Sequence, residues 1–208
     1  MKRAVIFDVD DVLVHGFHAH PERRESWTQL LSQFGMDAER FQTEFVLDVF
    51  FKKVVIGEMS IIEALDRRLP GLGYKGSTMA FAQSWLEYNA TPNTELLDAI
   101  RALKARDDVR LFLATNQDHL RAQWLWQTLG LCEYFEDMFY SARAGALKPQ
   151  KAFFDFAEAR MGKLEQPPLF FDDSPKVIDG ARARGWEAVL FSSNEDYFSN
   201  PWIAERLG

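Results

Sequence analysis

Short apolar runs alternate with longer amphipathic stretches along most of the chain. Four of these runs have the length and composition of buried strands, and they span 3–7, 109–115, 168–171 and 187–191. A candidate fifth strand covers 138–141. Apolar residues recur with the helical period of about 3.6 residues in three stretches, at 93–106, 150–162 and 175–185. Strands that alternate with helices in this way predict an α/β fold, in which helices cover both faces of a parallel sheet.

The segment 15–91 breaks this alternation. It contains four stretches with helical spacing and no clear strand; Phe41, Phe45 and Val49, for example, recur at every fourth position. We therefore predict an inserted all-helical domain at 15–91, within a core domain made of 1–14 and 92–208. The hinges are expected where the helical pattern stops, near Gly16 and across 90–92.

Polar side chains follow the predicted strands at the points where they end. The carboxyl ends of parallel strands share one edge of a sheet, where ligands bind. We expect these polar side chains to meet there: Asp8, Asp10, Thr115, Asn116, Lys148, Asp172 and Asp173. Crowded carboxylates repel one another unless a cation or a proton compensates their charge. Hard oxygen ligands of this kind suit Mg²⁺, so the sequence predicts an acidic magnesium pocket.

The composition limits the classes of partner. The chain has 208 residues and a net charge of −7, with no block of Lys or Arg, which weighs against nucleic acid or an anionic membrane surface as partner. The single cysteine, Cys132, allows no intrachain disulfide. The acidic start does not resemble a signal peptide, and no apolar run approaches the roughly 18 residues of a membrane span. We expect a soluble cytoplasmic protein.

Four motifs, in this order, resemble those of the haloacid dehalogenase-like (HAD-like) hydrolase superfamily, most of whose members are phosphatases. They are DVDDV at 8–12, Thr115 in LFLATN, Lys148 in GALKP, and the acidic pair in FFDDSPKVIDGARARG. The resemblance implies a Rossmann-like core with a C1-type helical cap at 15–91. The acidic pair of Asp172 and Asp173 resembles the fourth motif of one branch of this superfamily, which includes small-molecule phosphatases and hexose-phosphate mutases.

The resemblance also implies a role for each catalytic side chain. Asp8 would attack phosphorus to give an aspartyl-phosphate. Asp10 would protonate the leaving alcohol and then activate water, so we expect the surrounding carboxylates to raise its pKa. Lys148 would offset the negative charge of Asp8 and the phosphate, and the Thr115 hydroxyl and the Asn116 N–H would bind phosphate oxygens.

The same resemblance supplies the metal ligands and the substrate class. Mg²⁺ would bind Asp8, the Asp10 carbonyl and Asp173, with Asp172 either a ligand or the partner of a coordinated water. A cap over the strand ends excludes water and bulky protein substrates, which favours a small phosphorylated metabolite. The resemblance mildly favours sugar phosphates. The chain would act as a monomer or homodimer. Three alternatives stay open: a sugar phosphomutase, a 2-haloacid dehalogenase, and a non-catalytic phosphate-binding protein.

Several of these residues have purely structural interpretations. Asp8 and Asp10 could be turn or capping residues, Thr115 and Asn116 could cap the following helix, and Asp172-Asp173-Ser174 before Pro175 is a good helix start. We interpret Asp11 as a surface turn residue, at a position where related proteins often have Gly.

The remaining chemistry-bearing residues are expected to be structural. His15, His18 and His20 have a spacing that a transition metal could use, but linker or substrate contacts are favoured. We expect four cations to be mostly solvated charges on helix faces, with one of them able to reach the substrate as the alternative: Arg23, Arg24, Lys52 and Lys53. We expect the region of Trp124 and Trp126 to pack in the core, and Cys132 to be a small core or interface residue.

Overall fold

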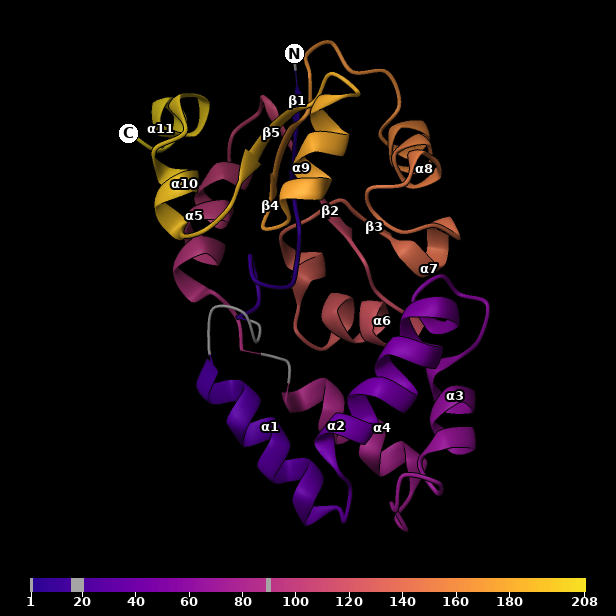
Figure 1. Ribbon diagram of the computed structural model, residues 1–208. Coiled ribbons are helices and arrows are strands. Elements are labelled where there is room, and N and C mark those ends of the chain that lie inside the picture. The colour runs from indigo at the N-terminus through magenta and orange to yellow at the C-terminus, as the bar shows by residue number, and fades with distance from the viewer. Residues whose placement is uncertain (1, 16–20, 89–90) are drawn as a thin grey trace.

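Five parallel strands form one sheet in the computed structural model, which describes residues 2–15, 21–88 and 91–208 (Figure 1). The strands are β1 (Arg3–Phe7), β2 (Val109–Thr115), β3 (Asp137–Tyr140), β4 (Leu169–Asp172) and β5 (Glu187–Leu190). Their order is β3-β2-β1-β4-β5, and all neighbours are parallel. β1 is therefore central, with β2 and β4 on either side. The predicted α/β class and parallel sheet are confirmed, and 138–141 is a strand to within one residue.

Different helices cover the two faces of the sheet, because side chains alternate along each strand. Val5 and Phe7 of β1 point into one core, and Ala4 and Ile6 into the other. The first core is closed by α5 (Thr94–Lys104), α6 (His119–Gln127), α10 (Asn194–Phe198) and α11 (Pro201–Leu207). The second is closed by α8 (Lys151–Met161) and α9 (Pro175–Arg182). The apolar pattern predicts α5, α8 and α9, whereas α6, α10 and α11 were not predicted.

Two short elements complete the core: the 3-10 helix η2 (Leu131–Glu133) and α7 (Ser141–Ala144).

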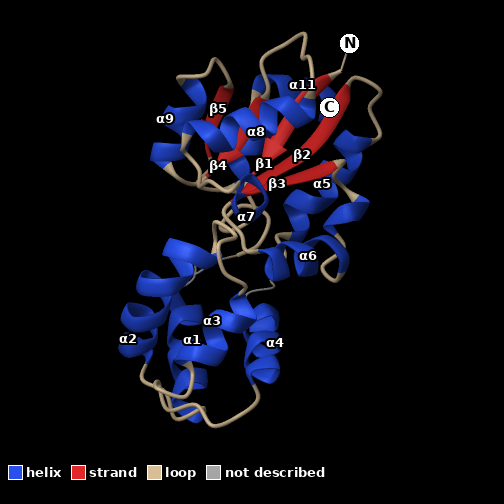
Figure 2. Cartoon of the chain, turned by 90° about the vertical axis from the view of Figure 1, so that its right-hand side faces the viewer, coloured by secondary structure: helices blue, strands red, loops and turns tan. Residues whose placement is uncertain are grey.

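Residues 21–88 contain helices and contribute no described strand to the sheet. The helices are α1 (Pro21–Gln33), α2 (Ala38–Arg40), the π-helix η1 (Phe41–Val54), α3 (Ile61–Arg68) and α4 (Thr78–Tyr88). Their apolar side chains form a third core around Phe45 and Phe81. This cap lies beyond the carboxyl ends of the strands (Figures 1 and 2). The predicted helical insertion is confirmed. The domain boundaries at 14/15 and 91/92 stay a prediction, since Gly16 and Ala90 lie outside the described residues.

Backbone contacts hold the cap over the sheet edge. In the linkers, the His15 N–H donates to the Thr91 carbonyl (2.9 Å) and the Asn93 N–H to the Leu13 carbonyl (2.8 Å). On the other side of the cap, the Ser141 hydroxyl donates to the Val55 carbonyl at 2.6 Å. Gly57 packs beside this contact with a φ of +80°, and a Cβ there would lie 2.5 Å from the carbonyl oxygen of Ala142. Only glycine satisfies both constraints, so the turn fixes how closely the cap approaches the core.

Within the described ranges, no helix combines the length and the apolar character that crossing a membrane requires.

Candidate active site

The three central strands deliver their polar residues to one place. Asp8 directly follows β1, Thr115 is the last residue of β2, and Asp172 is the last residue of β4. Because β2 and β4 both pair with β1, these strand ends are adjacent. Asp173 follows β4, and Lys148 reaches the same point from the loop after α7. The structure thus brings together residues that are up to 165 positions apart in the sequence.

Lys148 is the buried cation of the site. Its side chain is 2% exposed, and its Nζ lies 2.7 Å from an Asp172 carboxylate oxygen and 2.9 Å from one of Asp8. The same ammonium donates to the Ala114 carbonyl at 2.8 Å, so its three protons all have acceptors. Burial lowers the pKa of Lys148, but the two carboxylates outweigh burial and hold the pKa above its ordinary value.

Asn116 fixes the backbone of Lys148. Its side-chain carbonyl accepts the Lys148 N–H at 2.9 Å, and its amide donates weakly to the Lys148 carbonyl at 3.4 Å. The end of β2 therefore sets the position of the lysine loop.

Asp8, Asp172 and Asp173 form an acidic cluster with carboxylate oxygens within 4.8 Å of one another. Burial is the main cause that raises the pKa of Asp8 to about 8; Lys148 opposes this shift and Asp172 adds to it. Burial and the Asp172 charge raise the pKa of Asp173 to about 6. Three carboxylates beside one ammonium leave negative charge uncompensated.

The donor set of this cluster suits a hard divalent cation. Asp172 is fully buried, and its two oxygens accept from Lys148 and from the Ser174 N–H (2.9 Å). Asp8 accepts from its neighbouring Val9 N–H at 2.7 Å. Carboxylates held in this way are oxygen donors of the type that Mg²⁺ prefers.

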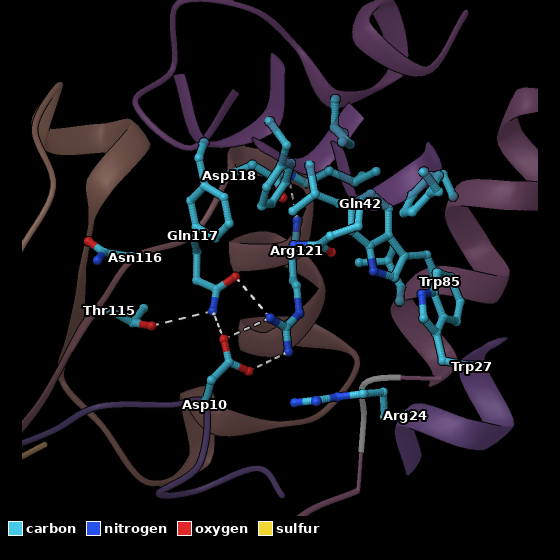
Figure 3. Close-up of a pocket in the computed structure, with 18 of the residues that line it drawn as sticks. Asp10, Arg24, Trp27, Gln42, Trp85, Thr115, Asn116, Gln117, Asp118 and Arg121 are labelled. Carbon is cyan, nitrogen blue, oxygen red and sulfur yellow. Dashed lines mark hydrogen bonds and ion pairs between the residues drawn. The ribbon is translucent and has the colours of Figure 1, made fainter. Parts of the chain in front are cut away.

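Asp10 is held by a cation that sequence reasoning missed. Arg121 of α6 binds its carboxylate with two hydrogen bonds of 2.7 and 2.9 Å, and the Gln117 amide donates to it at 2.6 Å (Figure 3). Desolvation under the cap raises the pKa of Asp10, but Arg121 and Gln117 together bring it below the ordinary value. The expected rise in this pKa was wrong, because the nearest charge is a guanidinium and not another carboxylate.

The position of Arg121 follows from the start of α6. The Asp118 side chain caps this helix, accepting the Leu120 and Arg121 N–H groups at 2.8 and 3.2 Å. Gln117 and Arg121 are four residues apart and contact each other at 3.2 Å. Gln117 also donates to the Thr115 hydroxyl at 3.3 Å, which links β2 to Asp10. The spacing Gln-Asp-x-x-Arg after a strand end was the available signal.

Asp11 adopts a φ of +58° in the turn after β1. This left-handed conformation is strained for a side chain with a Cβ and favours Gly, which agrees with its interpretation as a turn residue.

A cavity of about 870 Å³ lies between this site and the cap (Figure 3). Asp8, Asp10, Thr115 and Asp173 line its core side. Its cap side is lined by residues of α1, α2, η1, α3 and α4: Arg24, Trp27, Thr28, Ala38, Glu39, Phe41, Gln42, Val46, Phe50, Phe51, Ile61, Ala82, Trp85 and Leu86.

The other sequence-based expectations have mixed outcomes. Lys52 pairs with Asp48 on the surface, as expected, whereas Arg24 lines the cavity. Trp124 and Trp126 pack against the first core, as predicted. Cys132 is exposed, so its expected core position was wrong; it lies in the short surface helix η2. Three residues fall outside what is described: His18, His20 and the Arg23 side chain.

Comparisons with known proteins give one consistent result. A family model described as haloacid dehalogenase-like hydrolase matches residues 2–185. No protein with a curated description matches the chain.

Three solved structures show the same fold. A protein described as a predicted HAD-like family hydrolase from Porphyromonas gingivalis is 22% identical, with a TM-score of 0.74 and coverage of 100% of this chain and 98% of the other. A HAD family enzyme from Bacteroides thetaiotaomicron, in complex with magnesium and inorganic phosphate, is 20% identical (TM-score 0.66, coverage 90% and 93%). The L-2-haloacid dehalogenase from Xanthobacter autotrophicus is 21% identical (TM-score 0.60, coverage 98% and 86%).

Proposed function

The chain belongs to the haloacid dehalogenase-like hydrolase family, and on this basis we propose that it is a magnesium-dependent phosphatase for a small phosphorylated metabolite. The observation that carries the proposal is the position of the buried Asp8 carboxylate. It lines the cavity, contacts Lys148 and belongs to the acidic cluster. A free carboxylate is repelled by a phosphate ester because both groups are anionic. A buried carboxylate beside a cation site is suited to attack phosphorus, because the cation offsets this repulsion. The family resemblance alone would favour sugar phosphates, but the alcohol of the ester is set by the cap residues that line the cavity.

Mg²⁺ is the proposed cofactor. Asp8 and Asp173 would bind it, together with the Asp10 carbonyl, and Asp172 would hold Lys148 and a coordinated water. Bound there, the cation would neutralise charge on the phosphoryl group and allow the carboxylate to approach. The magnesium and phosphate complex of the Bacteroides thetaiotaomicron enzyme, which has the same fold, supports this assignment.

The reaction proceeds in two steps at Asp8. In the first step, an Asp8 oxygen bonds to phosphorus, the ester P–O bond breaks, and the leaving alkoxide takes a proton from Asp10. In the second step, water gives a proton to Asp10 and its oxygen bonds to phosphorus while the bond between phosphorus and the Asp8 oxygen breaks, which releases phosphate and restores the Asp8 carboxylate. Lys148 offsets the charge of Asp8, and the Thr115 hydroxyl and Asn116 N–H bind phosphate oxygens.

The contact between Asp10 and Arg121 favours one of the two proposed roles of Asp10 and opposes the other. As an ionised carboxylate on Arg121, Asp10 is set up as the base of the second step. To act as the acid of the first step, it must leave Arg121 and take up a proton. About 40% of its side chain is exposed and Asp10 lines the cavity, so a substrate bound in the cavity can contact it.

Phosphate release from a panel of esters tests the proposal. Release should require Mg²⁺, stop with EDTA and stop in Asp8→Asn. Asp98→Asn, at an exposed aspartate of α5, should keep full activity. Failure to release phosphate from any ester would leave a phosphate-binding protein. Chloride release from a 2-haloacid without metal would indicate the dehalogenase, and phosphate transfer within a bisphosphorylated sugar would indicate the mutase.

Asp10→Asn tests the two-step scheme. An alkyl phosphate should react on the order of a hundredfold more slowly, whereas an aryl phosphate with a good leaving group should lose much less in the first step. Because the second step then lacks its base, rapid quenching with labelled substrate should trap alkali-labile phosphate on Asp8. Equal losses on both esters without trapped label would remove Asp10 from this role.

A further inference from the structure

The cap side of the cavity is apolar wherever it is buried. Phe41, Ile61 and Ala82 are buried, and Trp27 and Trp85 are half-buried. The other half-buried cap residues of the lining are also aliphatic or aromatic. The cap's polar lining residues, in contrast, are all exposed. Among the described residues, the buried part of the cap lining is therefore apolar, whereas the exposed Arg24 extends toward Asp10 (Figure 3).

We propose that the substrate's alcohol is a bulky apolar group, preferably a fused aromatic ring system, and not a sugar. This inference rests on the proposed phosphatase function, because the phosphate at Asp8 places the alcohol of the ester against the cap. The cavity extends continuously from Asp8 to Trp27 and Trp85. Figure 3 shows these two indoles across the cavity from Asp10 and Thr115.

Five of the cap residues that line the cavity are aromatic, and Trp27, Phe41, Phe50 and Trp85 among them form a cluster. Trp27 and Trp85 are stacked with centroids 6.3 Å apart and planes at 25°. Phe50 lies 5.3 Å from Trp85 at 48°, and Phe41 meets Trp85 edge-on at 5.7 Å. Such a cluster presents both ring faces and ring edges, and offset or edge-to-face contacts with an aromatic ligand are favourable beyond the burial of area.

A sugar would fit this lining poorly. Each hydroxyl that leaves water needs a new hydrogen-bond partner, or its desolvation is a net cost. Within the part of the chain that the structure describes, such partners on the cap side are confined to four exposed side chains: Arg24, Thr28, Glu39 and Gln42. A hexose filling the cavity would place several hydroxyls against carbon.

The size of the cavity agrees with a large alcohol. Its volume of about 870 Å³ lies in the upper part of the usual range of roughly 300–1,000 Å³ for ligand pockets. Two or three fused rings fit beside the phosphate with room for a short linker, whereas a small alcohol would leave most of the apolar surface in contact with water.

Three esters of primary alcohols test the proposal without changing the leaving-group chemistry: 2-(2-naphthyl)ethyl phosphate, ethyl phosphate and a hexose 6-phosphate. With Mg²⁺, kcat/KM for the naphthylethyl ester should exceed that for ethyl phosphate on the order of a hundredfold, mainly through KM. The hexose phosphate should resemble ethyl phosphate. A hexose phosphate that equals or exceeds the naphthylethyl ester would overturn the inference while leaving the phosphatase intact.

Matched variants on one helix localise the effect. Val46 lines the cavity, whereas its neighbour Leu47 is exposed and does not. Val46→Asn should lower kcat/KM for the naphthylethyl ester about tenfold and leave ethyl phosphate nearly unchanged. Leu47→Asn should leave both within about twofold. Phe51→Gln, at an exposed lining residue, should act like Val46→Asn if the latter loses its cap fold.

Binding of the product alcohol, 2-(2-naphthyl)ethanol, separates this inference from the phosphatase proposal. Calorimetry should show binding with a negative heat-capacity change, weakened by Val46→Asn and unaffected by Leu47→Asn. If no ester releases phosphate, the phosphatase proposal fails, and this binding alone decides the chemistry of the cavity. Absence of binding, or equal binding in both variants, would refute an apolar ligand site.

Discussion

Replacing Asp8 by asparagine should stabilise the metal-free protein at alkaline pH, although it removes the proposed nucleophile. Folding brings Asp8, Asp172 and Asp173 together, and Lys148 is the cation in contact with Asp8 and Asp172. The substitution deletes one buried negative charge and keeps the shape of the side chain. The protein therefore loses repulsion without losing packing.

The magnitude follows from the pKa of Asp8, which burial raises from 3.8 to about 8. Because the folded pKa lies above the unfolded value, the folded state holds a proton that the unfolded state releases. This stabilisation is complete below about pH 4 and is lost as the pH rises through 8. A difference of about 4 pKa units corresponds to at most ~5 kcal/mol, and relaxation around the charge reduces it. We expect wild type to lose about 2–5 kcal/mol between pH 5 and 8.5. Asp173 acts in the same direction, with a folded pKa of about 6.

Urea denaturation in EDTA across this pH range measures the effect. The stability of wild type should fall with pH, that of Asp8→Asn should fall much less, and the variant should be the more stable protein at pH 8.5. Mg²⁺ should restore wild type far more than the variant, and Asp98→Asn should follow wild type throughout. Parallel stability curves for wild type and Asp8→Asn in EDTA would refute the electrostatic account of the cluster.

Three further predictions address neighbouring groups. Asp173→Ala should weaken Mg²⁺ affinity more than Asp172→Ala, because Asp172 is occupied by Lys148; the reverse order in a calorimetric titration would exchange the two roles. Arg121→Met should raise the pKa of Asp10 and so move the acid limb of the pH–rate profile to higher pH, whereas an unchanged limb would separate Arg121 from catalysis. Asp11→Gly should stabilise the fold by about 1 kcal/mol in thermal unfolding by relieving the left-handed backbone, and a loss of stability would contradict the strain.

Much of the core fold could be predicted from local patterns. Buried parallel strands are continuous apolar runs, so all five strands could be found, and α5, α8 and α9 repeat apolar residues at helical spacing. Other helices lack this signal. α6 has buried residues only at Ala122 and Leu125 and carries Trp and Gln around them, and α10 and α11 are short. Their positions depend on contacts with strands that are distant in the sequence.

The candidate site could also be predicted from the sequence only in part. Motif order predicts that Asp8, Lys148 and Asp173 belong to one site, since the strand ends of a parallel sheet share an edge. The partner of Asp10 could not be obtained in this way, because Arg121 reaches it only through the capped start of α6. The charge that surrounds a residue depends on which side chains fold beside it, so a pKa inferred from sequence neighbours alone was wrong.

The π-helical winding of η1 determines which of its side chains line the cavity. A π-helix turns about 80° per residue, so Phe41 and Phe50, which are nine residues apart, lie at nearly the same angle around its axis, and Val46 lies about 40° from Phe41. An α-helix turns about 100° per residue and would place Phe41 and Phe50 on opposite sides. Removing one residue from η1 should therefore rotate its lining away from the cavity while leaving every lining side chain chemically unchanged, so the proposed substrate preference would depend on the helical winding.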